Sequence, residues 1–120
     1  MKIAITTSGT DLNAAVDTRF GRAAGFIVYD TETKAFETAD NTQNLNAAQG
    51  AGIQTAQNVA ATGTKIVITG HCGPKAFRIL SASKITVYLA EAGSVQNALD
   101  LFEKNGLTEI KGADVEGHWA

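Results

Sequence analysis

The chain has 120 residues and a mass of 12.5 kDa, which fits one domain of ordinary size. Ten lysines and arginines against twelve aspartates and glutamates give a net charge of -2, so the chain lacks the basic surface typical of proteins that bind nucleic acid or anionic membranes. Its single cysteine, Cys72, excludes an internal disulfide and a thiolate-rich zinc site. No apolar run reaches transmembrane length and the first residues do not form a signal peptide, so we expect a cytoplasmic protein.

The first forty residues carry short runs that are typical of β-strands. The expected strands cover residues 2–7, 26–30 and 35–39, with a weaker extended segment at 14–18. The turn residues 31–34 separate two of these strands, which predicts a β-hairpin. Residues 40–46 are polar, amide-rich and without periodicity, so we expect a loop there.

From Gly50 onward the pattern changes to helices that alternate with strands. Apolar residues recur at helical spacing between Ile53 and Ala60, before a glycine that can end the helix at position 63. Strands are expected at 65–70 and 85–89, and each is followed by a helix, the first starting at Pro74 and the second capped by Ser94. This order predicts parallel strands with right-handed crossovers. Together with the hairpin it predicts a mixed α/β sheet over residues 1–106, followed by a tail at 107–120 without a clear period.

Ligands of such sheets bind beyond the carboxyl ends of the parallel strands. Three loops of this chain would build that edge, at residues 7–9, 70–73 and 90–93. The candidate binding residues in and beside these loops are Ser8, Gly70, His71, Cys72, Gly73, Glu91, Gly93 and Ser94.

Cys72 precedes a predicted helix and follows His71. A helix N-terminus and a neighbouring imidazolium both favour the thiolate, which could be a nucleophile, a redox group or a ligand for a soft metal such as Cu(I). Its spacing to Arg78 matches that of cysteine-dependent phosphatases, although Pro74 favours an early helix start that carries Arg78 about a turn along the helix. The sequence therefore leaves open a phosphatase-like or thiol redox enzyme. It equally leaves open that Cys72 is a small buried residue packed beneath the turn.

Arg19-Phe20-Gly21-Arg22 places two guanidinium groups around a predicted turn. Guanidinium groups suit oxyanions and other diffuse anions. The competing interpretation is a pair of surface charges that Asp11, Asp17 or Asp30 partly neutralises. A third hypothesis is a protein-interaction or nucleotide-sensing module that uses the same edge without any metal.

Several segments, in this order, carry a family resemblance. They are Met1-Lys2-Ile3-Ala4-Ile5, Val16-Asp17 with Arg19-Phe20-Gly21-Arg22, Gly50-Ala51-Gly52-Ile53-Gln54, Gly70-His71-Cys72-Gly73-Pro74-Lys75-Ala76-Phe77 and Val87-Tyr88 with Glu91-Ala92-Gly93-Ser94-Val95. Together they resemble the dinitrogenase iron-molybdenum cofactor biosynthesis proteins over about residues 1–106. The resemblance implies a ribonuclease-H-like fold with a mixed five-stranded sheet flanked by helices. It also implies a non-enzymatic binding or carrier role.

The cargo that the resemblance implies is a molybdenum-containing metal-sulfur cluster. It would be a molybdenum-copper sulfide of the thiomolybdate type or a precursor of the iron-molybdenum cofactor, with protein partners in cluster assembly or delivery. Such a cluster is a bulky, soft anion that suits guanidinium groups, backbone N–H groups and an apolar wall. The groups expected to supply these are Arg19 and Arg22, the 70–74 turn and the Ser94 cap, and Phe20 or Phe26. Family members often carry an apolar residue or glycine before the Gly-Pro pair, so His71 and Cys72 of this chain are additional candidate ligands for copper or molybdenum.

Overall fold

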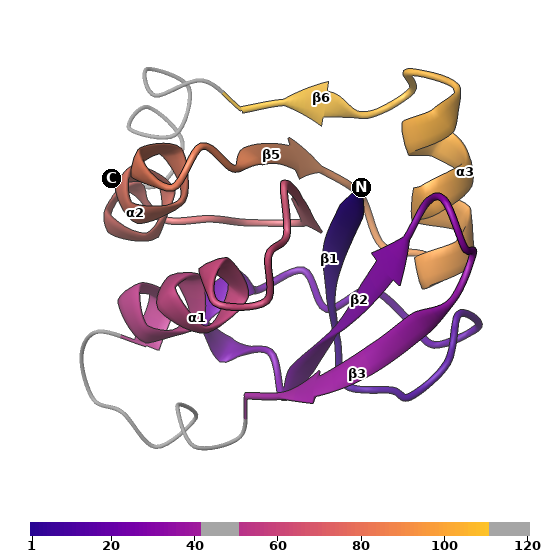
Figure 1. The fold of residues 1–120 in the computed structure, drawn as a ribbon, viewed down its shortest axis with the longest axis horizontal. Coiled ribbons are helices and arrows are strands. Elements are labelled where there is room, and N and C mark those ends of the chain that lie inside the picture. Colours follow the sequence, from indigo (N-terminus) through magenta and orange to yellow (C-terminus); the bar gives the residue numbers. More distant parts are fainter. Residues whose placement is uncertain (42–50, 111–120) are drawn as a thin grey trace.

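One of the two central strands of the sheet is β1 (Lys2–Thr7), and all of its residues except the first are buried. Its neighbours are β2 (Gly25–Asp30), which runs antiparallel to it, and β4 (Ile66–Thr69), which runs parallel. Outside these lie β3 (Phe36–Asp40), antiparallel to β2, and β5 (Thr86–Leu89), parallel to β4. The computed structural model describes residues 1–41 and 51–110, and these ranges confirm the predicted mixed α/β sheet (Figure 1).

The strand count differs from the prediction, because the sheet has six strands rather than five. The sixth, β6 (Thr108–Glu109), pairs antiparallel with β5, which gives the order β3-β2-β1-β4-β5-β6. Two exposed residues show no alternation of apolar and polar side chains, so nothing in the sequence indicated this strand. The sheet thus continues past residue 106, and residues 111–120 of the predicted tail lie outside the described residues.

Two predictions for the first half of the chain, an extended segment at 14–18 and a loop at 40–46, differ from the structure. The expected extended segment at 14–18 makes only isolated bridges, Thr7 with Val16 and Ala15 with Ser94, and is not a strand. The expected loop at 40–46 begins one residue too early, since Asp40 ends β3 and Asn41 is buried. The remainder of that loop, 42–46, lies outside the described residues.

Helices cover both faces of the sheet, and two separate apolar clusters result. On one face α1 (Ala51–Ala60) and α2 (Pro74–Ala82) pack their small apolar side chains on alternate strand residues. On the other face α3 (Val95–Glu103) does the same with the remaining alternate residues (Figure 1). None of the helices in the described ranges is both long enough and apolar enough to span a bilayer.

The connections after β4 and β5 therefore lead to opposite faces of the sheet. Residues 70–73 carry the chain from β4 to α2, where Pro74 occupies the first helical turn and its fixed φ favours the helix start. Residues 90–94 carry it from β5 to α3, where the Ser94 hydroxyl accepts a hydrogen bond from the Asn97 N–H at 3.0 Å. Both predicted helix starts are confirmed.

Candidate functional site

Residues 14–20, which we call the crossing segment, run across the carboxyl ends of the parallel strands. The Val16 N–H donates to the Gly93 carbonyl at 2.7 Å, beyond the end of β5. Farther along, the Asp17 N–H donates to the Thr6 carbonyl at 2.7 Å and the Phe20 N–H to the His71 carbonyl at 3.0 Å. The crossing segment therefore brings Phe20 and Arg19 beside the loop that follows β4.

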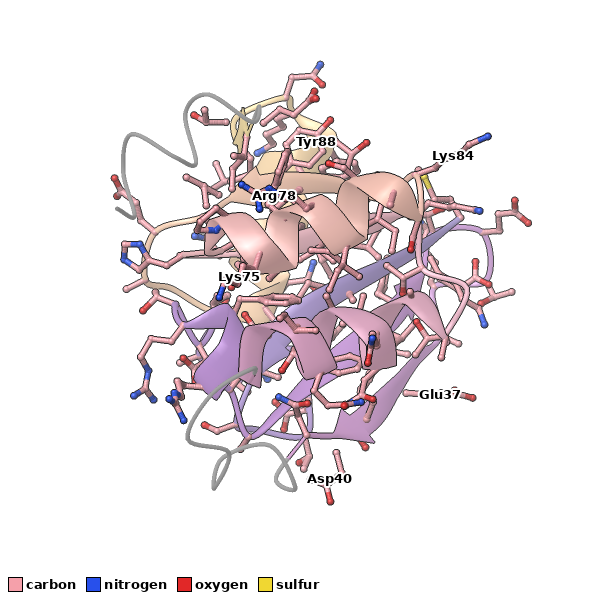
Figure 2. The ribbon with its side chains drawn as sticks, turned by 90° about the vertical axis from the view of Figure 1, so that its left-hand side faces the viewer. Glu37, Asp40, Lys75, Arg78, Lys84 and Tyr88 are labelled. Atoms are coloured by element: carbon pink, nitrogen blue, oxygen red, sulfur yellow. The ribbon has the colours of Figure 1, made fainter. Side chains whose placement is uncertain are left out.

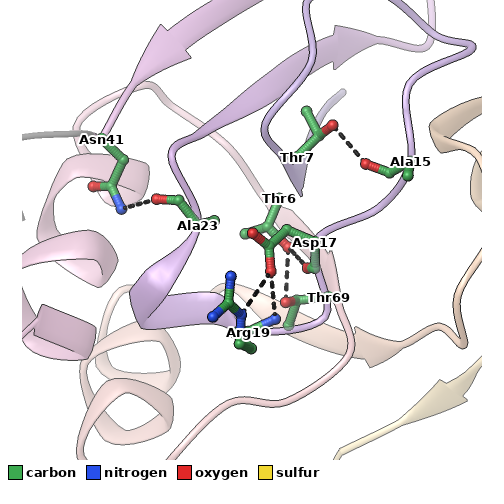
Figure 3. A network of polar contacts seen from close by, with 8 residues as sticks. All are labelled: Thr6, Thr7, Ala15, Asp17, Arg19, Ala23, Asn41 and Thr69. Atoms are coloured by element: carbon green, nitrogen blue, oxygen red, sulfur yellow. Dashed lines mark hydrogen bonds and ion pairs between the residues drawn. The ribbon is translucent and has the colours of Figure 1, made fainter. Parts of the chain in front are cut away.

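Buried threonine hydroxyls hold the crossing segment in place (Figure 3). Thr6 Oγ1 donates to the Asp17 carbonyl at 2.6 Å and lies 2.8 Å from Thr69 Oγ1, while Thr7 Oγ1 donates to the Ala15 carbonyl at 2.6 Å. Burying a hydroxyl group without a hydrogen-bond partner costs free energy. These hydrogen bonds therefore hold the crossing segment against the strand ends. Thr7 belongs to the predicted edge loop at 7–9, whereas Thr6 and Thr69 were not predicted, although hydroxyls at the ends of apolar strands are a usable signal.

Arg19 lies at the edge of this assembly. Its Nε lies 3.4 Å from Asp17 Oδ1, which also accepts a hydrogen bond from the Arg19 N–H at 3.0 Å. The Arg19 side chain is 68% exposed and that of Asp17 is 13% exposed. The predicted pairing with an aspartate is therefore present, and Asp17 sets the position of a guanidinium group that still faces solvent. Arg22 is also exposed, at the end of the short 3-10 helix η1 (Phe20–Arg22).

The N-terminal turns of α1 and α2 border a cavity of about 270 Å³, which we call the helix-end pocket. Its lining residues are Phe20, Gly21, Gly52, Ile53, Gly73, Pro74, Lys75 and Ala76. The two helices lie side by side with their N-terminal ends on the same side of the molecule (Figure 2). They approach closely, because a Cβ atom added to Gly52 would lie 3.4 Å from the Ala76 Cβ.

The charge of the helix-end pocket is positive. Lys75 is the charged residue among its lining residues, and no side chain of the described residues caps the N-terminus of α2. The first-turn N–H groups of a helix and the positive end of its dipole attract anions. In Figure 2, Lys75 lies on the side of α2 that faces α1, whereas Arg78 lies on the side nearer Tyr88.

The N-terminus of α3 does not offer free N–H groups to an anion, because carbonyls of residues 12 and 14 already accept hydrogen bonds from its first turn. The Val95 N–H donates to the Ala14 carbonyl at 2.9 Å and the Gln96 N–H to the Leu12 carbonyl at 2.8 Å, while Ser94 itself caps the next N–H. Gly93 accepts the hydrogen bond from Val16. The expectation that the Ser94 cap supplies N–H groups to an anion does not fit these contacts, since the protein's own backbone uses them.

Cys72 is fully buried in the apolar cluster beneath α1 and α2. Burial raises the pKa of its thiol from 9.0 to about 12, because a thiolate in this apolar environment would lose its hydration. The position before a helix N-terminus favours the thiolate, but the loss of hydration outweighs it. The interpretation of Cys72 as a small buried residue therefore fits the structure better than a reactive thiolate. His71, the preceding residue, is exposed.

A second cavity, of about 560 Å³, lies between the carboxyl ends of β4 and β5, and we call it the strand-end crevice. Its lining residues are Thr18, Gly70, His71, Leu89, Ala90, Glu91, Ala92 and Thr108.

The predicted edge residues therefore divide between two cavities. Phe20 and Gly73 line the helix-end pocket, whereas Gly70, His71 and Glu91 line the strand-end crevice. The other predicted residues line neither cavity; they are Ser8, Arg19, Arg22, Cys72, Gly93 and Ser94. Within residues 1–41 and 51–110, no group of three or more histidine, cysteine, aspartate or glutamate side chains is placed to hold a metal ion.

Comparison with known proteins gives one family match that spans most of the chain. The family model described as dinitrogenase iron-molybdenum cofactor matches residues 1–105. The apo form of the orange protein from Desulfovibrio gigas is 41% identical, with a TM-score of 0.89 over 92% of this chain and 93% of its own.

Two other relatives are similar over comparable lengths. The solution structure of a candidate NifB protein from Thermotoga is 38% identical, with a TM-score of 0.80 over 90% of this chain and 91% of its own. An uncharacterized protein of Methanocaldococcus jannaschii is 29% identical over 113 residues, which is 92% of each chain.

Proposed function

Because the chain belongs to the dinitrogenase iron-molybdenum cofactor family, we propose that it binds and carries a molybdenum-containing metal-sulfur cluster and catalyses no reaction of its own. The cargo we propose is a molybdenum-copper sulfide of the thiomolybdate type, with a precursor of the iron-molybdenum cofactor as the alternative cargo. Protein partners in assembly or delivery would load and unload it. The ribonuclease-H-like class of the fold and a cytoplasmic location stay predictions.

The helix-end pocket is the cluster site in this proposal, and one observation carries it. Two helix N-termini and Lys75 border an otherwise apolar cavity, and none of the described residues that line it carries a carboxylate. A thiomolybdate-type cluster is a large anion with soft sulfide ligands, so it suits a positive potential inside apolar walls. The strand-end crevice suits it less, because the Glu91 carboxylate lines that cavity and repels an anion.

Arg19 and Arg22 flank the pocket wall rather than line it. Arg22 is the last residue of η1 and Arg19 directly precedes it. The other two residues of η1, Phe20 and Gly21, line the helix-end pocket. Guanidinium groups at the rim of a cavity attract an anion from solution and stabilise it once bound. We therefore assign Arg19 and Arg22 to the attraction of the cluster and Lys75 to direct contact with it.

His71 and Cys72 differ in how accessible their side chains are to a metal. His71 is exposed, lines the strand-end crevice rather than the helix-end pocket, and stays a candidate ligand of the cluster. The Cys72 thiol is buried and protonated at neutral pH, which argues against its ligation of metal in this conformation. The same burial argues against a phosphatase-like or thiol redox enzyme. Arg78 also lies along α2 on the side away from α1 (Figure 2).

The test is an anaerobic titration of the metal-free protein with tetrathiomolybdate and Cu(I), followed by absorption spectroscopy and metal analysis after desalting. A saturable charge-transfer spectrum at a fixed ratio of metal to protein supports the proposal. Lys75→Ala should weaken binding about five-fold, since one charge near a surface anion contributes about 1 kcal/mol after screening. The control Lys104→Ala removes the same charge from the C-terminal cap of α3 and should leave binding unchanged. A flat or purely additive spectrum of the unmodified protein would contradict the cluster role.

A further inference from the structure

The strand-end crevice lies at a special point of the sheet topology. Its two walls come from neighbouring parallel strands, β4 and β5. The chain leaves β4 towards α2 on one face of the sheet and leaves β5 towards α3 on the other face (Figure 1). In open α/β sheets, connections that diverge in this way leave a crevice at the carboxyl ends of the strands, and ligands bind there.

The chemistry of the crevice is opposite to that of the helix-end pocket. Glu91 contributes a carboxylate, and no lysine or arginine is among the lining residues that the structure describes. Within the described ranges, no hydrogen bond or ion pair joins the Glu91 side chain to another residue. A carboxylate in a concave site with apolar walls attracts cations, because the walls concentrate its field.

The remaining lining residues favour an organic cation over a metal ion. Among the described residues there is no group of three metal-ligating side chains, so a metal ion would lack ligands here. Leu89, Ala90 and Ala92 form an apolar wall that suits the methylene groups of an alkyl chain. The His71 imidazole offers an aromatic face on which a planar guanidinium group can stack.

From these features we propose that the strand-end crevice binds an alkylguanidinium group, with the planar cation on Glu91 and its methylene chain along the apolar wall. A guanidinium fits better than an ammonium, because its fork of N–H donors matches the two oxygens of a carboxylate. Such a group occurs in small guanidinium compounds and in the arginine side chain of a protein. Gly70 and His71 of the crevice are separated from Gly73 and Pro74 of the helix-end pocket by one residue, so the two cavities share one connecting loop.

The test uses the full chain labelled with nitrogen-15, and its probes are n-butylguanidine and N-acetylarginine N-methylamide, observed through backbone amide signals. Each probe carries one positive charge, so a difference in affinity reports on the peptide groups alone. Saturable shifts should centre on Gly70, His71, Ala92 and Thr108. N-acetylcitrulline N-methylamide, which has a neutral urea group in place of the guanidinium, should cause no such shifts. Equal affinity for butylguanidine and the arginine derivative assigns the crevice to free guanidinium compounds, whereas tighter binding of the arginine derivative assigns it to a protein partner.

The matched variants separate this site from general surface charge. Glu91→Gln should weaken binding about five-fold, the upper range for one partly exposed ion pair, while Glu103→Gln at the end of α3 removes the same charge without effect. Shifts that are absent, that spread over other residues, or that persist in Glu91→Gln would overturn the proposal. The experiment contains no cluster, so its outcome is independent of the proposed carrier function.

Discussion

The buried thiol of Cys72 leads to a sharp prediction about its reactivity. At about pH 8 a thiol with its ordinary pKa of 9.0 is roughly 10% thiolate, whereas a thiol with a pKa of about 12 is roughly 0.01% thiolate. Only the thiolate attacks iodoacetamide, so the folded chain should react about a thousand-fold more slowly than an ordinary thiol. Complete burial of the side chain slows the reaction further, because the reagent must reach the sulfur.

The assay compares alkylation of the folded chain with that of the same chain in denaturant, with mass spectrometry as the readout. The folded protein should be alkylated at least about a hundred-fold more slowly than the unfolded chain at about pH 8. A rate within about ten-fold of the unfolded chain would refute the reasoning and restore Cys72 as a candidate nucleophile or ligand.

The same raised pKa predicts how stability depends on pH. The folded state holds the thiol proton more tightly than the unfolded state does, so this contribution to stability is fully present below about pH 9. It should be lost as the pH rises from about 9 towards about 12. Chemical denaturation of the protein and of Cys72→Ala across this range isolates the effect, because the variant has no thiol to titrate.

Three substitutions test individual contacts that hold the fold together, each by urea denaturation. Gly70→Ala should lower the free energy of unfolding by about 1–3 kcal/mol, because the new Cβ overlaps Thr18, whereas the control Gly73→Ala meets open space and should change it little. Ser94→Ala should lower the free energy of unfolding by about 1 kcal/mol, because the helix cap is lost, and an unchanged free energy of unfolding would show that the cap does not stabilise the fold. Asn41→Ala should cost about 1–3 kcal/mol, since the Asn41 amide donates at 3.0 Å to a buried carbonyl that would lose its partner, and a loss below about 0.5 kcal/mol would contradict that.

The elements with clear periodicity were predictable from the sequence, and the short or irregular ones were not. The apolar run at 66–69 and the helix starts at Pro74 and Ser94 depend on local chemistry that the sequence displays. β6 depends on pairing with β5, a tertiary contact that two exposed residues do not reveal. The crossing segment likewise forms through hydrogen bonds to distant strand ends rather than through its own pattern.

The candidate site, like the fold, was predictable from the sequence only in part. Sequence reasoning placed the right loops at the carboxyl edge, because strand order fixes which loops meet there. It treated them as one site, whereas the structure has two cavities of opposite charge, lined by Lys75 and by Glu91. It also counted Ser94 as a donor of N–H groups to a ligand, although residues 12 and 14 take up those groups. Such differences arise from the path of the crossing segment, which no local pattern encodes.

Anomalous diffraction at the molybdenum edge, from crystals of the protein loaded with tetrathiomolybdate and Cu(I), would locate the cluster directly. We expect an anomalous peak in the helix-end pocket, between the N-terminal turns of α1 and α2 and beside Lys75. A peak in the strand-end crevice beside Glu91, or on the surface away from both helix N-termini, would show that the helix-end pocket is not the cluster site.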